Sequence, residues 1–87
     1  MSILAGTDAV ARFGLRPKMR MVSFAFAGVS PDEMGLGPIP ATEKALDKAG
    51  LSFADIGAIE INEAFAAIAL AVLRELGLSE DIVNVEG

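Results

Sequence analysis

The chain has 87 residues, of which 53% are hydrophobic, and its formal net charge at pH 7 is −5. Without cysteine or histidine, it has no thiol nucleophile, no disulfide framework and none of the usual neutral-pH proton shuttles. The acidic balance, with a pI near 4.5, argues against nucleic-acid binding, and a mean hydropathy of +0.52 is high for a single small domain.

The N-terminal third of the chain predicts one short helix and one strand. Thr7 is placed to cap a helix over Asp8 to Phe13, and Gly14 ends that helix. Residues 20–27 then alternate between large and small side chains, which is typical of a strand with one bulky and one small face. Four basic residues near the N-terminus lack interleaved aromatics and are interpreted as a solvated edge: Arg12, Arg16, Lys18 and Arg20.

Proline and glycine punctuate the middle of the chain. Residues 28–40 predict a loop, and its Gly35-Leu36-Gly37 lacks the Lys-Ser/Thr pair of a phosphate-binding loop. The expected elements that follow are a helix over 40–49 ending at Gly50, a capping turn at Ser52 and Asp55, a strand over 58–62, a helix over 63–76 ending at Gly77, and a strand over 82–86.

Helices and strands alternate in this order, which predicts an α/β fold with a three-stranded, mainly parallel sheet. Residues 64–73 are all apolar, so the helix over 63–76 has almost no polar face and should be buried on all sides. A chain this short cannot cover both that helix and the sheet. We therefore expect an incomplete layered sandwich that self-associates or pairs with the rest of a larger protein.

The chain is expected to be soluble and cytoplasmic, with no membrane partner. Its N-terminus lacks the basic region and the long apolar run of a signal peptide. The apolar run at residues 64–73 is about half the length of a bilayer-spanning helix.

Asn62 and Glu63 stand at the junction between the expected strand and the apolar helix. Ligands of open parallel sheets bind at the carboxyl ends of the strands, where helix N-termini also point. An Asn62 amide there could orient a water or an oxyanion. Asparagine is also a preferred N-cap, and glutamate is favoured in a first helical turn, so the local pattern leaves a purely capping interpretation open.

Four segments of the chain carry a specific resemblance: GVSPDEMGLGPIPATEKAL, KAGLSFADIGAIEINEAFAAIAL, LRELGL and IVNVEG. Together they resemble the C-terminal half of the thiolases, above all in the Met-Gly-x-Gly-Pro loop and the later Asn-Glu-Ala-Phe block. The resemblance implies that residues 1–87 form a partial thiolase C-terminal domain, with the apolar helix sandwiched between two sheets. It also implies acyl transfer between coenzyme A thioesters in fatty-acid metabolism, including β-oxidation.

The resemblance assigns roles to four residues. Asn62 matches the asparagine that holds a water in the oxyanion hole for the thioester oxygen. Met34, Ala64 and Phe65 match positions that line the acyl and pantetheine end of the pocket. The two cysteines and the histidine that thiolases use have no counterpart here, so the chain alone is expected to be inactive. Neither a metal nor a covalently bound cofactor is implied, and the acyl-CoA thioester is the substrate.

Two positions depart from the family pattern. Ile68 stands where a glutamine is common, and Glu86 stands where an asparagine is common and would add negative charge near the pocket floor. The alternative function is a non-catalytic thiolase-like module that pairs with a full-length subunit. An acyl-carrier-like protein would need an Asp-Ser-Leu attachment site, which this sequence lacks.

Overall fold

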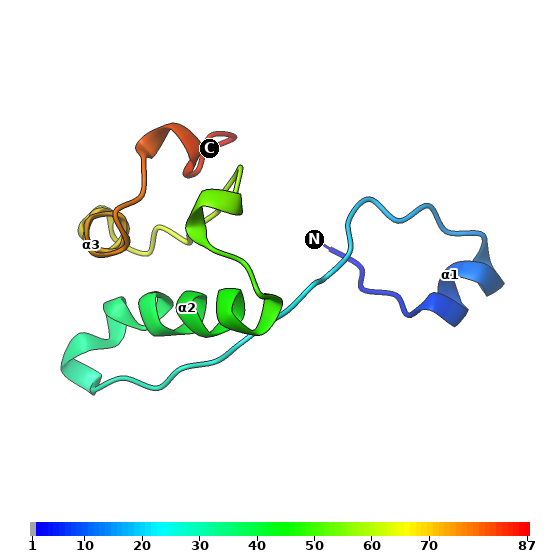
Figure 1. Ribbon diagram of the computed structural model, residues 1–87, viewed down its shortest axis with the longest axis horizontal. Helices are drawn as coiled ribbons and strands as arrows, with labels where there is room; N and C mark the ends of the chain where they lie inside the picture. The colour runs from blue at the N-terminus through cyan, green and yellow to red at the C-terminus, as the bar shows by residue number, and fades with distance from the viewer. Residues whose placement is uncertain (1) are drawn as a thin grey trace.

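A computed structural model describes residues 2–87, and within them three α-helices are joined by extended segments and short 3₁₀ turns. The helices are α1 (Thr7–Phe13), α2 (Pro38–Ala49) and α3 (Ala66–Leu76), and the turns are η1 (Pro31–Leu36), η2 (Phe53–Asp55) and η3 (Glu80–Ile82). Helices α2 and α3 pack together, whereas α1 lies apart at the end of a long extended segment (Figure 1). The radius of gyration is 15.3 Å, whereas a compact chain of this length has about 12 Å.

All three α-helices end at the predicted glycines. Gly14, Gly50 and Gly77 have φ angles of 60°, 66° and 63°, in the left-handed region that glycine enters without a Cβ clash. The predicted capping turn is also confirmed, because the Ser52 N–H and hydroxyl both donate to the Asp55 carboxylate, at 2.9 and 3.1 Å. Local chain chemistry is therefore enough to set where these helices stop.

The starts of α1 and α2 differ from the prediction. Helix α1 begins at Thr7 with Gly6 as its N-cap, so the predicted Thr7 cap is wrong by one residue. Helix α2 begins at Pro38 and not at Pro40, because both prolines fit a first turn, where backbone N–H groups are unpaired anyway. The predicted loop at residues 28–40 therefore contains η1 and the start of α2.

The predicted three-stranded sheet is not formed within residues 2–87. The last two predicted strands meet only in an isolated parallel bridge between Ile59 and Val83. In this bridge the Ile59 N–H donates to the Ile82 carbonyl, and the Asn84 N–H donates to the Ile59 carbonyl, each at 2.8 Å. The main-chain pairing goes no further, because Asn84 turns into the left-handed region with a φ of 50°.

The remaining predicted strand, residues 20–27, is extended but has no strand partner among the described residues. It runs beside α2 instead, where the Ser23 hydroxyl donates to the Ala45 carbonyl at 2.6 Å and the Lys48 ammonium donates to the Phe24 carbonyl at 3.2 Å. Its small residues face the body of the molecule, and the three large side chains on the other face are 61–84% exposed. The alternation was predicted correctly, but a strand needs a neighbour to form a sheet.

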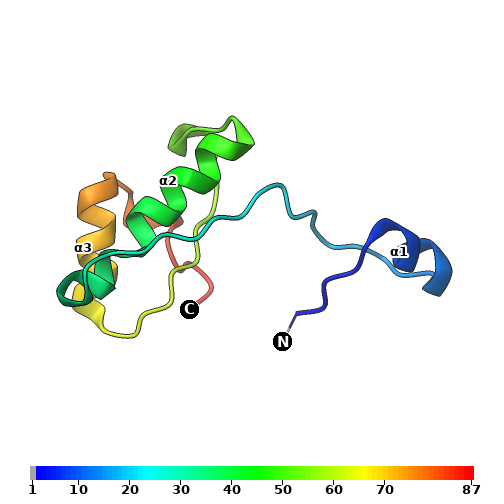
Figure 2. The same ribbon diagram turned by 90° about the horizontal axis from the view of Figure 1, so that it is seen from below.

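The core is small and centred on α3. Within residues 2–87 its buried apolar residues are Ala69, Val72 and Leu73, and only Val72 is fully enclosed. Figure 2 shows α3 at the edge of the molecule beside α2, and Leu70 on α3 is 45% exposed. The expected burial of this helix on all sides is therefore not met inside this chain. Among the described helices, none is long and apolar enough to cross a membrane.

Candidate functional site

Asn62 lies in an extended segment and not at a helix N-terminus. Helix α3 begins at Ala66 with Phe65 as its N-cap, so Glu63 and Ala64 do not open the helix as predicted. Both the capping interpretation of Asn62 and the argument from the helix dipole are therefore wrong. Its side chain is exposed, and within residues 2–87 the hydrogen bonds at this junction are made by its neighbours.

The segment around Asn62 is held by the side chain of Asn84. The Ile61 N–H donates to Asn84 Oδ1 at 2.7 Å, and Asn84 Nδ2 donates both to the Ile61 carbonyl at 3.0 Å and to Glu63 Oε1 at 2.6 Å. The amide thus extends the parallel pairing one step beyond the Ile59 bridge, with side-chain atoms in place of main-chain atoms. Asn84 holds residues 61 and 63 in this way, and α3 begins at Ala66, three residues later than the predicted start at Glu63.

Two hollows meet at Asn62. The first has a volume of about 450 Å³ and is mostly apolar, with side chains from α2 and α3 in its lining. The second has a volume of about 500 Å³ and a mostly polar lining of Glu60, Ile61, Asn62, Glu63, Asn84 and Gly87. Glu60, Ile61 and Asn62 line both hollows, and of these three residues Asn62 carries a side-chain amide. Its amide therefore stands where an apolar group in the first hollow would meet the polar groups of the second.

The structure brings three of the four predicted site residues to the apolar hollow. Met34, on η1, lines this hollow together with Asn62 and Ala64. Phe65 is the N-cap of α3, is 70% exposed and is not among the residues that line it. The roles of all four residues toward an acyl-CoA stay predictions.

Ile68 also lines the apolar hollow and packs against η1. A Cβ atom added to Gly35 would lie 2.9 Å from Ile68 Cγ1 and 3.0 Å from Ile68 Cδ1, closer than normal carbon contacts allow. A side chain at position 35 would therefore require either the Ile68 side chain or the spacing between η1 and α3 to shift. The departure from the family pattern at Ile68 fills space next to the site with an apolar side chain.

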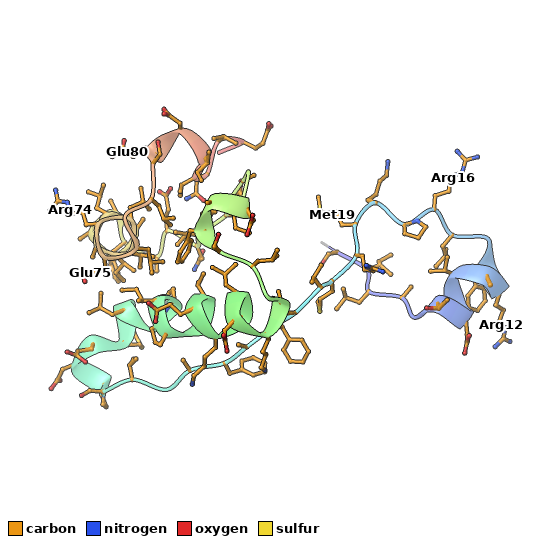
Figure 3. The ribbon with its side chains drawn as sticks, in the orientation of Figure 1. Arg12, Arg16, Met19, Arg74, Glu75 and Glu80 are labelled. Atoms are coloured by element: carbon orange, nitrogen blue, oxygen red, sulfur yellow. The ribbon has the colours of Figure 1, made fainter. Side chains whose placement is uncertain are left out.

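Charged side chains are placed mostly outside the apolar hollow. Among the described residues Glu60 is the charged residue in its lining, and Glu86 lines neither hollow, so the charge expected near a pocket floor is not observed. Arg12 and Arg16 extend into solvent at the far end of the molecule, which agrees with the predicted solvated edge (Figure 3). The hollow is therefore suited to apolar groups.

Asp55 is a fully exposed carboxylate away from Asn62. Its pKa is lowered below the ordinary value of 3.8 because the Ser52 N–H, and then the Ser52 hydroxyl, donate to the ionised carboxylate. This shift belongs to the capping turn and not to the chemistry of the hollows.

Asn84 was not predicted as a site residue, because residues 82–86 have the pattern of a plain strand. Asparagine is the residue, after glycine, that most readily adopts a left-handed backbone conformation. An asparagine inside the apolar run Ile-Val-Asn-Val was therefore a signal that the strand turns there.

Comparison with known proteins confirms the resemblance. A family model for the thiolase C-terminal domain matches residues 15–87. An acetyl-CoA acetyltransferase of Rhizobium meliloti is 60% identical over 99% of this chain and 22% of its own length. A 3-oxoadipyl-CoA/3-oxo-5,6-dehydrosuberyl-CoA thiolase of Escherichia coli is 55% identical over 95% of this chain and 21% of its own length.

A solved structure shows the same likeness in three dimensions. The crystal structure of human mitochondrial 3-ketoacyl-CoA thiolase superposes with a TM-score of 0.90 and 46% identity, over 95% of this chain and 21% of that one. The chain therefore belongs to the thiolase family, as a segment with the fold of its C-terminal domain. It spans about a fifth of the length of the curated relatives it matches.

Proposed function

We propose that this chain is part of a thiolase that transfers acyl groups between coenzyme A thioesters. The reaction is thiolysis of a 3-ketoacyl-CoA by coenzyme A, which yields a shortened acyl-CoA and acetyl-CoA, or the reverse condensation. The observation that carries the proposal is the position of Asn62 at the two hollows, in a chain that belongs to the thiolase family. Its exposed amide caps no helix and stands where an apolar hollow meets a polar one.

Within this reaction Asn62 acts as a polar donor in the oxyanion hole. Its amide holds a water whose hydrogen points at the thioester oxygen, and this oxygen gains negative charge when the carbonyl carbon is attacked. A fixed donor at that point stabilises the transition state more than the substrate, and loss of one such donor costs about 2.7–4 kcal/mol.

The other predicted residues contact the apolar parts of the substrate. Met34 and Ala64 line the apolar hollow, and Phe65 follows Ala64 directly at the start of α3. In this proposal they pack against the acyl chain and the pantetheine arm. The nucleophile and the acid/base groups come from outside residues 1–87, because this chain has no cysteine or histidine. The expected cytoplasmic location is part of the same proposal.

The proposal is tested by substituting Asn62 in a complete thiolase that carries residues 15–87 in place of its own matching segment. Asn62→Ala and Asn62→Asp should each lower kcat for acetoacetyl-CoA thiolysis about a hundredfold. The melting temperature should change little, because Asn62 is not an N-cap. Asp47→Asn, an amide-for-carboxylate change at an exposed position of α2, is the control and should retain turnover.

The second candidate function is a non-catalytic thiolase-like module that pairs with a full-length subunit. The observation that favours it is the apolar surface left exposed on α3, where Leu70 is 45% exposed and would be covered by a partner subunit. If both Asn62 variants keep normal turnover, the oxyanion role fails. Co-purification of the 87-residue chain with a full-length thiolase subunit would then support the module.

A further inference from the structure

We propose that Asn84 is a positioning residue, whose side-chain amide fixes Asn62 at the meeting of the two hollows. The inference rests on the proposed function of Asn62 and extends it to a second residue 22 positions further along the chain. Asn84 has no part in the roles that the thiolase resemblance assigns.

The hydrogen bonds of Asn84 hold both neighbours of Asn62. Oδ1 accepts from the Ile61 N–H at 2.7 Å, and Nδ2 donates to the Ile61 carbonyl at 3.0 Å and to Glu63 Oε1 at 2.6 Å. A primary amide has two N–H hydrogens, and both have partners on this segment. The main chain of Ile61 and the side chain of Glu63, on either side of Asn62, are therefore both bonded to the planar side-chain amide of Asn84.

The conformation of Asn84 fits this role better than that of a strand residue. Its φ of 50° lies in the left-handed region, which costs a non-glycine residue about 1 kcal/mol or more. If Asn84 stayed extended, the pairing could continue through main-chain atoms, and its amide would not be needed at Ile61. The structure instead bends the backbone and uses the half-buried side chain to complete the pairing.

The consequence concerns the geometry of Asn62. Within residues 2–87 the hydrogen bonds that fix this segment are made to residues 61 and 63 by Asn84, while the Asn62 side chain itself is exposed. An oxyanion donor is effective only when it is held in place before the charge develops. The Asn84 amide holds the segment that carries Asn62 in place before substrate binds. Asn84 also lines the polar hollow together with Asn62 and Glu63.

Two substitutions of Asn84 test this in the complete thiolase carrying residues 15–87. Asn84→Gly keeps a residue suited to the left-handed backbone and removes the amide. Asn84→Asp keeps an acceptor for the Ile61 N–H and sets a second carboxylate against Glu63. Each should lower kcat for acetoacetyl-CoA thiolysis about ten- to a hundredfold, with the KM within about threefold, because the donor is displaced and not removed.

A compensating pair separates positioning from simple stabilisation. Asn84→Asp combined with Glu63→Gln exchanges the amide and the carboxylate, so the hydrogen bond between positions 63 and 84 is restored with its direction reversed. This double variant should recover part of the lost kcat, because the bond to position 63 is restored and the bond to the Ile61 carbonyl is not. A role limited to stability would lower the melting temperature, while kcat per folded enzyme stays unchanged well below that temperature. That result, or a double variant no more active than Asn84→Asp, overturns the inference.

Hydrogen exchange at the Ile61 amide gives a readout that does not depend on turnover. Its exchange should be slow in the complete enzyme and much faster in Asn84→Gly, whereas Asn62→Ala should leave it slow. An Ile61 amide that exchanges equally fast with and without the Asn84 side chain contradicts the inference.

A double-mutant cycle distinguishes this inference from the proposed function. In the Asn62→Ala background, Asn84→Gly should have almost no further effect on kcat, because the positioned group is already gone. If Asn62→Ala itself leaves kcat unchanged, the oxyanion role fails. If Asn62→Ala lowers kcat and Asn84→Gly does not, only the positioning role of Asn84 fails.

Discussion

The 87-residue chain on its own should not behave as a stable monomer, and the reason can be worked from its exposed surface. The structure has an accessible surface of 7201 Å². A compact 9.0 kDa protein exposes about 4,900 Å². The excess of about 2,300 Å² is more than half apolar on average, so about 1,300 Å² of apolar surface stays in water.

This excess is large compared with the net stability of a domain. At about 25 cal/mol per Å², the unburied apolar surface corresponds to about 30 kcal/mol of lost hydrophobic stabilisation. Folded domains are stable by only about 5–15 kcal/mol. The exposed surface includes Leu70 and Phe65 at α3 and the large side chains of residues 20–27. The free energy gained by covering these groups favours self-association or pairing with another chain.

The assay is sedimentation velocity over a range of micromolar concentrations, together with urea unfolding followed by circular dichroism. We expect concentration-dependent oligomers or aggregates and no single cooperative transition. Leu70→Lys should shift the distribution toward monomer, whereas Glu75→Gln, which also raises the net charge by one on α3, should not. A monomer that unfolds in one sharp transition, with a slope of about 1 kcal/mol per molar urea or more, would refute the reasoning.

Two further predictions concern packing and pH. Gly35→Ala in the complete enzyme should lower stability by about 1–3 kcal/mol, because the new methyl group meets Ile68 at 2.9 Å. In an Ile68→Ala background, Gly35→Ala should cost less stability. Gly57→Ala, where a Cβ would meet no atom within 4 Å, is the control in thermal melts. Equal melting temperatures for the two glycine variants would contradict the contact. The Asp55 carboxyl should titrate in an NMR experiment with a pKa below 3.8, because the folded state favours its ionised form. The contribution of this carboxyl group to stability is then present above pH 3.8 and is lost as pH falls through the lowered pKa. In the complete enzyme, Ser52→Ala should bring that pKa part of the way back to 3.8. A midpoint at or above 3.8 in the complete enzyme without this substitution would argue against the capping turn.

Some features followed from local chemistry and could be predicted from the sequence. The three α-helices end at Gly14, Gly50 and Gly77, because glycine accepts the left-handed conformation that closes a helix. The Ser52 and Asp55 turn formed as predicted, since both partners lie within one turn of chain. The family was also recognisable from residues 28–87, and the match over residues 15–87 confirms it.

The sheet and the environment of Asn62 were decided only by tertiary contacts. A strand needs hydrogen-bond partners on another segment, and alternation in residues 20–27 cannot say whether such a partner is present. Asparagine is a common N-cap residue, so the sequence allowed Asn62 to cap the helix. The Asn84 amide instead bonds residues 61 and 63, and α3 begins at Ala66. The sequence alone determined which residue types stand at the site and where its helices end. The hydrogen bonds from Asn84 to Ile61 and Glu63 join residues 23 and 21 positions apart, so they depend on the folded chain, and they hold the segment that carries Asn62.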